Sequence, residues 1–306
     1  MNLLDTIGQT PLVPLPDGLA QLPRGVSVWL KLEGTNPGGS VKDRAARGIV
    51  ADAERRGLRP GATIVDASSG NTGIAYAMIA GNRGYSLVLC LPANASPERK
   101  RLLEAYGARV VPTSALEGTD GAQREAARLA EQHPDWVWLN QYDNDANWRA
   151  HFDTTGPELW AQTEGRITHL VATLGTTGTL VGTGRYLRSR RADVEVVEVQ
   201  PDSPMHGLEG VKHLATARVP GIYDPTVATA RVEASSERAF ATVRCLARRG
   251  WLVGPSGGAA VDAAVAVARG LDHGVVVAIV PDSGARYLSD AHLWTPTEED
   301  PCRLAS

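Results

Sequence analysis

The sequence predicts an α/β protein built on mostly parallel sheets. Short apolar, β-rich runs alternate with helix-like segments almost throughout the chain, and this alternation is typical of parallel sheets covered by helices on both faces. The 306 residues exceed one average domain, so we expect a large domain or two half-domains that share a cleft. Ligands in such sheets bind beyond the carboxyl ends of the strands, so the chemistry is expected in the loops that follow strands.

The elements follow one another in a regular order. Apolar, β-rich runs predict strands at residues 26–32, 62–67, 86–91, 108–111, 136–140, 169–174, 194–199 and 275–280. Helix-like segments predict helices at residues 41–56, 73–80, 97–106, 121–132, 148–161, 179–188, 236–249 and 258–269. The least regular stretch is 201–225, which is rich in Gly, Pro and His. It is longer than a usual connection, so it is either a functional loop or a disordered one.

The composition argues against several classes of function. The chain is 43% hydrophobic and 21% charged, which is ordinary for a soluble globular protein. Its 31 Lys and Arg residues against 34 Asp and Glu residues give a net charge of -3, so neither a nucleic-acid partner nor an anionic membrane is expected. The apolar runs are too short to span a membrane, and residues 1–10 lack the pattern of a signal peptide.

Cysteine and histidine usage adds two expectations. Cys90, Cys245 and Cys302 are far apart and odd in number, so no disulfide framework is expected and a cytoplasmic location follows. The 7 histidines show no H-x-x-x-H or H-E-x-x-H spacing, so no metal site is expected. No G-x-S-x-G elbow for hydrolysis occurs either.

The first of four conspicuous loops has the sequence NPGGSVKDR at residues 36–44. Ser40, followed three residues later by Asp43, fits a helix N-cap with an acidic partner. Lys42 then lies in the first helical turn, where the helix dipole disfavours an ammonium group and lowers its pKa. A lysine that can lose its proton is what a Schiff base requires, although a solvated surface lysine also fits this pattern.

The second loop, DASSGNTG at residues 66–73, runs from a strand into a helix. It offers three hydroxyl groups, an amide and two glycines at a helix N-terminus. Backbone N–H groups at such a position form an anion site that suits a substrate carboxylate. The alternative is an ordinary capped turn with Ser68 or Ser69 as the N-cap.

The third loop, GTTGT at residues 175–179, follows a strand and opens a helix. Glycines let the backbone approach an oxyanion closely, while threonine hydroxyls and amides donate to it, so this loop is predicted to bind phosphate. It contains neither the Gly-Lys-Ser/Thr of a Walker A loop nor the G-x-G-x-x-G of a dinucleotide fold. The fourth loop, GPSGG at residues 254–258, places Ser256 where it either donates to a neutral ring nitrogen or caps a helix.

Together and in this order, the four loops resemble those of the cysteine synthase and cystathionine β-synthase family of fold-type II pyridoxal-phosphate enzymes. The similarity extends from IGQTPL at 7–12 to RYLS at 286–289, nearly the whole chain. KLEG at 31–34, GRITH at 165–169 and the pair Thr176 and Thr177 look closest to the B-type cysteine synthases.

The resemblance implies an architecture as well as a cofactor. We expect two three-layer αβα domains with mostly parallel sheets and pyridoxal 5′-phosphate in the cleft between them. The smaller domain would comprise residues 38–147, and the larger one residues 1–37 and 148–306. A homodimer is expected on the same ground.

The resemblance also assigns roles to residues. Lys42 is expected to form the internal aldimine with the cofactor and to move the Cα proton. Asn71 would hydrogen-bond the 3′-oxygen of the cofactor, and Ser256 would face its pyridine nitrogen. The cofactor phosphate would be held by Gly175, Thr176, Thr177, Gly178 and Thr179. The substrate α-carboxylate would be held by Ser69, Thr72 and Gln141, with Ser68 where a threonine is more usual.

Three positions depart from the family pattern. Ala67 stands where many members have proline, Asp145 stands in a segment where Asn-Pro-Ala-Asn is common, and Gly257 replaces the second serine of the usual Ser-Ser-Gly. These departures bear on substrate detail rather than on the class of reaction.

The implied reaction is a ping-pong β-replacement. O-acetylserine or O-phosphoserine would lose acetate or phosphate to leave an aminoacrylate, and sulfide or thiosulfate would add to give cysteine or S-sulfocysteine. A serine at the ring nitrogen does not keep the pyridinium protonated, which favours loss of the β-substituent over transamination. In B-type and phosphoserine-using relatives a basic residue near the position of Lys212 reaches the substrate pocket. We therefore expect Lys212 to bind an anionic group, with a solvated loop lysine as the alternative.

Other functions fit parts of the sequence. Cystathionine β-synthase, which uses serine and homocysteine, has nearly the same core motifs. Serine/threonine dehydratases of this fold usually carry a tetraglycine phosphate loop, which residues 175–179 do not. An NAD-dependent oxidoreductase would suit the fold, but this sequence lacks the G-x-G-x-x-G fingerprint of such enzymes. A non-catalytic binding relative would not need Lys42.

Overall fold

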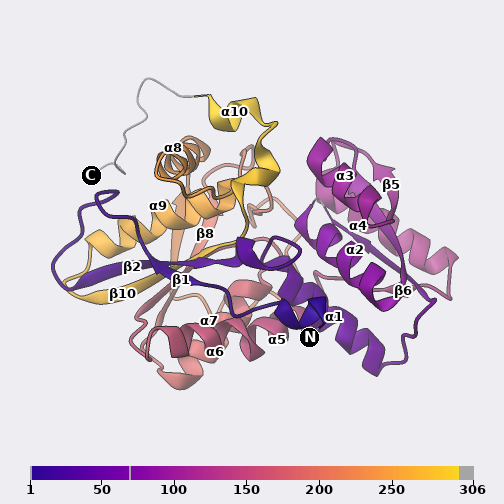
Figure 1. The fold of residues 1–306 in the computed structure, drawn as a ribbon, viewed down its shortest axis with the longest axis horizontal. Helices are drawn as coiled ribbons and strands as arrows, with labels where there is room; N and C mark the ends of the chain where they lie inside the picture. The colour runs from indigo at the N-terminus through magenta and orange to yellow at the C-terminus, as the bar shows by residue number, and fades with distance from the viewer. Residues whose placement is uncertain (1, 69, 296–306) are drawn as a thin grey trace.

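The structure is a computed structural model that describes residues 2–68 and 70–295. Within these residues the strands form a six-stranded and a four-stranded sheet, each packed against helices. Figure 1 shows the four-stranded sheet with α2 (Asn71–Arg83), α3 (Pro97–Ala105) and α4 (Gly118–Gln132) in a lobe beside the larger one. The predicted α/β fold with mostly parallel sheets is confirmed.

The six-stranded sheet has the order β1-β2-β10-β7-β8-β9. Strands β1 and β2 pair antiparallel, with Leu12 opposite Lys31, and the other neighbours are parallel. Successive residues of β7 belong to different hydrophobic clusters, because alternate side chains of a strand point to opposite faces. The strands are β1 (Leu12–Pro14), β2 (Val26–Leu32), β10 (Gly274–Val280), β7 (His169–Thr173), β8 (Glu195–Pro201) and β9 (Ala230–Ala234).

Helices cover both faces of this sheet. One cluster packs α8 (Ser236–Ala247) and α9 (Pro255–Arg269) against it, and the other includes residues of α6 (Thr155–Gln162) and α7 (Gly178–Arg190). Apolar strands buried on two faces account for the nearly continuous hydrophobic run of β10. The short α10 (Ala291–Trp294) packs against α8.

The four-stranded sheet is parallel and has the order β5-β4-β3-β6. Its strands are β3 (Thr63–Ala67), β4 (Ser86–Pro92), β5 (Arg109–Thr113) and β6 (Val137–Trp138). All of them lie inside the predicted smaller domain, residues 38–147, whose exact bounds stay a prediction. Leu4 and Ile7 pack into the hydrophobic cluster that contains residues of α1 (Lys42–Arg55) and α2.

Some predicted elements differ from those observed. The single helix predicted at 148–161 is wrong. α5 (Ala146–Asp153) ends before Thr154, whose φ is -128°, and α6 begins after it at Thr155. Pro157 lies in the first turn of α6, where its missing N–H is tolerated, but it could not continue α5. The short strands β1 and β9 were not predicted, because their few residues carry no clear alternation.

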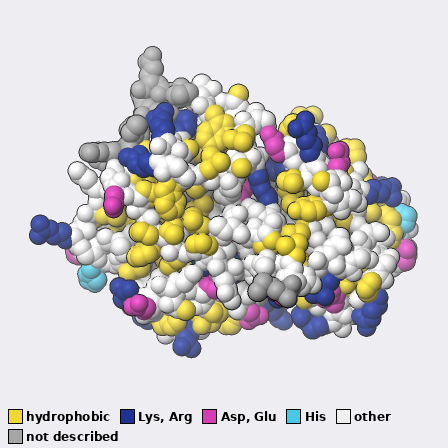
Figure 2. All heavy atoms as spheres, in the orientation of Figure 1, with side chains coloured by type: hydrophobic (Ala, Val, Ile, Leu, Met, Phe, Trp, Pro, Cys, Tyr) yellow, Lys and Arg dark blue, Asp and Glu magenta, His cyan; other side chains and the backbone are white. Residues whose placement is uncertain are grey.

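Several sequence expectations concern the chain as a whole. No helix among the described residues is long and apolar enough to cross a membrane. Cys90 and Cys245 are buried and are not joined in a disulfide, whereas Cys302 lies outside the described residues. In the same part of the chain no group of His, Cys, Asp and Glu has the arrangement of a metal site. On the face drawn in Figure 2, Lys and Arg side chains are interspersed with Asp and Glu.

Candidate active site

Loops that follow strands of both sheets line one cavity of about 570 Å³. Lys42, Asn71 and Gly175 line this cavity and also a narrower pocket of about 40 Å³ that contains Ser256. The predicted site residues are thereby brought together from positions more than 200 residues apart. The set on these walls comprises Lys42, Ser68, Asn71, Thr72, Gln141, Gly175, Thr176, Thr177, Thr179, Lys212 and Ser256.

Lys42 is the first residue of α1 and is half-buried in the cavity wall. Burial lowers the pKa of its ammonium group, and the charge of Asp282 is the largest influence that opposes this. The predicted direction of the pKa shift is therefore confirmed, but burial rather than the helix terminus is its main cause. A lysine held in this way loses its proton more readily than a solvated one.

The predicted cap of α1 has a different form. Val41 is the N-cap residue and makes no side-chain cap bond. The hydroxyl of Ser40 accepts from the Lys42 N–H at 3.2 Å, and Asp43 accepts from the Gly38 N–H at 2.5 Å. Burial raises the pKa of Asp43 to about 7. Because Asp43 turns back to Gly38 instead of Ser40, it closes the loop in front of Lys42 rather than completing a capping box.

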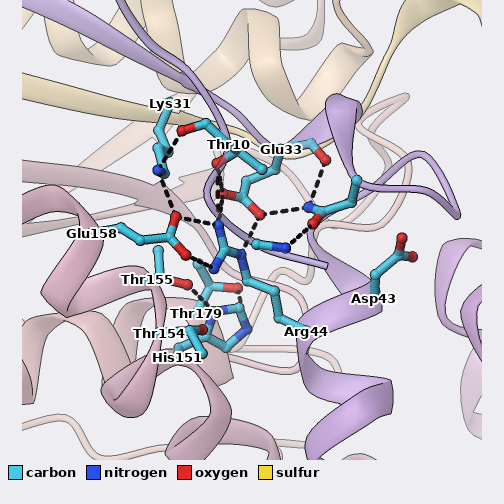
Figure 3. A network of polar contacts seen from close by, with 12 residues as sticks. Thr10, Lys31, Glu33, Asp43, Arg44, His151, Thr154, Thr155, Glu158 and Thr179 are labelled. Carbon is cyan, nitrogen blue, oxygen red and sulfur yellow. Dashed lines mark hydrogen bonds and ion pairs between the residues drawn. The ribbon is translucent and has the colours of Figure 1, made fainter. Parts of the chain in front are cut away.

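A buried ionic network anchors the start of α1. Arg44 donates two hydrogen bonds to Glu33, at 2.7 and 2.9 Å, and two to Glu158, at 2.6 and 2.7 Å. Lys31 donates to Glu158 at 2.8 Å. Figure 3 shows the Arg44 guanidinium between the two carboxylates, while Asp43 points away from it. Two cations balance two anions, so the network fixes α1, and Lys42 with it, without leaving a buried charge unpaired.

The predicted phosphate loop lies between β7 and α7. Thr177 has a φ of 72°, which is strained for a β-branched residue, and its Oγ1 is buried without a hydrogen-bond partner in the described structure. A Cβ added to Gly175 would lie 2.6 Å from the Gly210 carbonyl oxygen. Gly178 begins α7, whose first N–H groups lack intrahelical acceptors as at any helix start.

His151 reaches this loop from α5. Its Nε2 lies 3.3 Å from the Thr179 hydroxyl, and its Nδ1 lies 2.9 Å from the Thr155 hydroxyl (Figure 3). Burial and the charge of Arg44 lower the pKa of His151 well below its usual range. The imidazole is therefore neutral and joins the phosphate loop to Thr155 at the start of α6.

Ser256 lies in the first turn of α9 and is buried. The N-cap residue of α9 is Gly254, which makes no side-chain cap bond. Ser256 therefore does not cap its helix, and its hydroxyl lines the narrow pocket together with Lys42 and Thr177.

The loop after β3 behaves in part as a capped turn. The Ser68 hydroxyl accepts from the N–H groups of Gly70 and Gly73, at 3.0 and 3.1 Å. These bonds use its lone pairs and leave its proton available to an anion. Thr72 is buried beside it in the cavity wall. Ser69 lies outside the described residues.

Gln141 is buried and tied to the same loop. Its Nε2 donates to the Ala67 carbonyl at 2.6 Å, and its backbone N–H donates to Asp66 at 3.2 Å. Burial raises the pKa of Asp66 to about 7, although N–H groups of Ala67 and Gln141 oppose the shift. These bonds fix the side chain of Gln141 in the cavity wall.

The irregular segment 201–225 follows a defined path along the cavity. Lys212 is 8% exposed; its Nζ lies 3.1 Å from Asp120 Oδ1 and 5.3 Å from the centre of the Tyr142 ring. Glu209 pairs with Arg99 of α3. Segment 201–225 belongs to the larger lobe, and both of its partners belong to the smaller one, so these ion pairs cross between the lobes.

Sequence reasoning missed several residues of the site. Asp282 and Arg286 follow β10 and contact Asn71. The rule that chemistry follows strand ends points to Asp282, but the loop after β10 has no glycine-rich motif to attract attention. Arg99 lies within a helix, and Asn147, which donates to the Thr176 hydroxyl at 3.1 Å, belongs to α5. No local pattern marks either residue.

The residues present fit pyridoxal phosphate. The unpartnered Thr177 hydroxyl and the start of α7 suit a phosphate group. Lys42, with its lowered pKa, suits a covalent bond to an aldehyde, and Ser256 offers a neutral hydroxyl on the wall of the same pocket.

Comparisons with known proteins agree with this fit. Residues 3–282 match the family model described as "Pyridoxal-phosphate dependent enzyme". The chain is 46% identical to a cysteine synthase from Aquifex aeolicus over 95% of this chain and 91% of the relative. It is 43% identical to cysteine synthase B from Salmonella typhimurium over 94% of this chain and 95% of the relative.

A solved structure gives the same result at the level of the fold. The crystal structure of an O-ureido-L-serine synthase aligns with a TM-score of 0.90 at 40% identity, over 97% of this chain and 96% of that one. The family match and the long, similar relatives together settle the classification. The chain therefore belongs to the family of pyridoxal-phosphate dependent enzymes, and it is a cysteine synthase-like member of that family.

Proposed function

We propose that this enzyme replaces the β-substituent of O-acetylserine or O-phosphoserine with sulfur. Sulfide as the donor would give cysteine, and thiosulfate would give S-sulfocysteine. The observation that carries the proposal is the convergence of Lys42, the loop 175–179 and Ser256 on one pocket. The kinship with cysteine synthases supports sulfur as the incoming group.

Pyridoxal phosphate, when bound, supplies the electron sink for the charge left on Cα after its proton is removed. We assign that proton transfer to Lys42, because burial favours its neutral amine. Ser256 offers a neutral hydroxyl to the ring nitrogen rather than a carboxylate. This choice favours loss of the β-substituent over transamination.

The substrate α-carboxylate is proposed to bind at the start of α2. Ser68 and Thr72 lie there, Gln141 closes the site from the β6 side, and Ser69 is proposed to take part as well. Backbone N–H groups at a helix N-terminus attract an anion, and hydroxyl protons add donors to them.

Lys212 is proposed to bind the anionic part of a substrate. It lines the cavity and is buried, which supports a binding role over a solvated one. Asp120 partly neutralises it, so its preference for anions depends on that carboxylate. We further propose a cytoplasmic homodimer, on family grounds.

A spectral titration tests the proposed function. The purified enzyme is titrated with O-acetylserine and with O-phosphoserine, and the products formed with sulfide, thiosulfate and homocysteine are then identified. We expect each competent serine ester to change the cofactor absorbance and sulfide to restore it with release of cysteine. Formation of cystathionine from serine and homocysteine, without cysteine from sulfide, would contradict the proposal.

A further inference from the structure

The carboxamide of Asn71 lies between two groups of opposite charge. Its Nδ2 donates to Asp282 Oδ2 at 2.6 Å, and its Oδ1 accepts from an N–H of Arg286. Both partners follow β10 in the larger lobe, whereas Asn71 begins α2 in the smaller one. These contacts therefore also join the two lobes.

The chemistry of the partners fixes which way the amide points. An ionised carboxylate only accepts hydrogen bonds, and a guanidinium group only donates them. Turning the Asn71 amide over would place its oxygen against Asp282 and its N–H groups against Arg286. An acceptor would then face an acceptor at Asp282, and a donor would face a donor at Arg286. The observed orientation is therefore strongly preferred.

Both partners are themselves held in place. Asp282 is 2% exposed and also accepts from the Tyr287 hydroxyl at 2.6 Å. Arg286 donates to the Gly38 carbonyl, in the loop that precedes Lys42. The Val41 N–H donates to the Pro281 carbonyl at 2.8 Å. The start of α1 and the loop after β10 therefore form one scaffold around Asn71.

We propose that Asp282 and Arg286 are positioning residues that orient the Asn71 carboxamide towards the cofactor. An amide nitrogen carries two N–H groups, and Asp282 takes one of them. The other N–H of Asn71 is then left to donate to the 3′-oxygen of pyridoxal phosphate. This inference rests on the proposed role of Asn71.

A double-mutant cycle tests the proposal. Arg286→Gln and Asp282→Asn are each made in the parent protein and in an Asn71→Ala background. Glutamine and asparagine both donate and accept, so neither imposes a direction on the amide. The readouts are the absorption maximum of the bound cofactor and the affinity of the full-length protein for pyridoxal phosphate, measured by equilibrium dialysis.

In the parent, each variant is expected to shift the absorption maximum and to weaken cofactor affinity about two- to tenfold, the effect of one neutral hydrogen bond. In the Asn71→Ala background each loss should be at least about twofold smaller, because the residue acted upon is gone. Asp282→Asn should still weaken cofactor affinity somewhat in that background, because the charge of Asp282 also raises the pKa of Lys42.

Equal losses in both backgrounds would overturn the proposal. Arg286→Lys keeps a cationic donor and should retain most of the parent affinity, so a loss as large as that of Arg286→Gln would also overturn it. Arg238→Gln, which removes a surface arginine paired with Asp262, serves as the control. If Asn71→Ala alone changed neither readout, Asn71 would lose its proposed role and this inference would fail with it. Cysteine formation, assayed separately, would still stand.

Discussion

Replacing Lys212 with alanine removes a buried ammonium group from the wall of the cavity. If that group binds the phosphate of O-phosphoserine or thiosulfate, the variant should lose kcat/KM for these charged compounds. Its activity with O-acetylserine and sulfide should be nearly unchanged. Glu209 and the loop 175–179 stay in place, so the change is confined to one wall of the cavity.

The structure sets the size of this effect. A hydrogen bond between charged groups contributes about 1.5–3 kcal/mol, which corresponds to about ten- to a hundredfold in kcat/KM. Lys212 is 8% exposed, so solvent screens such a contact little. Asp120 lies 3.1 Å from Lys212 and would be left without that cation in the alanine variant, which adds repulsion of an anionic substrate.

Asp120→Asn should act in the opposite direction. It removes the partner that neutralises Lys212, and the Asp120 side chain is 34% exposed. A partly exposed ion pair contributes about 0.2–1 kcal/mol, so kcat/KM for the charged substrate should rise by up to about fivefold. The opposite signs of the two variants separate an electrostatic role from a general disturbance of the cavity.

The assay is steady-state kinetics of both variants with O-acetylserine and O-phosphoserine as esters and with sulfide and thiosulfate as donors. Lys100→Ala is the matched control, because Lys100 donates to the Ala93 carbonyl and does not line the cavity. Equal losses for all substrates, or no loss for any, would refute the role proposed for Lys212.

Four further predictions concern the cofactor, the ring nitrogen, acid stability and assembly. The protein should be yellow, and borohydride reduction with peptide mapping should place the label on Lys42 among the four lysines of the chain. The Lys42→Ala variant should carry no such label. A label on another lysine would contradict the assignment. Ser256→Ala should lower turnover about two- to tenfold, as expected for one neutral hydrogen bond, and Ser256→Asp should lower it more. Unchanged turnover in Ser256→Asp would refute the argument that the ring nitrogen needs a neutral partner. Burial would raise the pKa of Glu158, but Arg44 and Lys31 lower it to about 2. Its contribution to stability, on the order of 3 kcal/mol, is therefore present above its usual pKa of 4.5 and is lost as the pH falls towards 2. Glu158→Gln should reduce the acid-side dependence of Tm, and an unchanged profile would count against the network. Sedimentation at micromolar concentration should show a dimer rather than a 32.5 kDa monomer.

Much of the fold was predictable because its elements carry local signals. The alternation of apolar strands and helices was enough to predict the class, and most predicted elements overlap observed ones. The exceptions are instructive. The break at Thr154 needed the effect of Pro157 on a helix turn to be recognised, and β9 is an edge strand whose residues are mostly exposed.

The candidate site divides in a similar way. Loops such as 66–73 and 175–179 were found because glycine, serine and threonine at a helix start are visible in the sequence. Their chemistry follows from backbone N–H groups and short side chains, which neighbouring residues supply. Lys42 was found for the same reason, although the sequence suggested the helix dipole and the structure shows burial as the main cause of its lowered pKa.

The sequence by itself therefore determined the class of fold, and it pointed to the candidate loops and to Lys42. Only the tertiary structure decided which polar and charged groups meet. Asn71 and Arg286 are 215 residues apart, and Lys212 and Asp120 are 92 apart, yet each pair is in contact. Such pairs leave no periodic or local pattern in the chain. They form because two sheets place their loops around one cavity, where burial makes every unpaired charge costly.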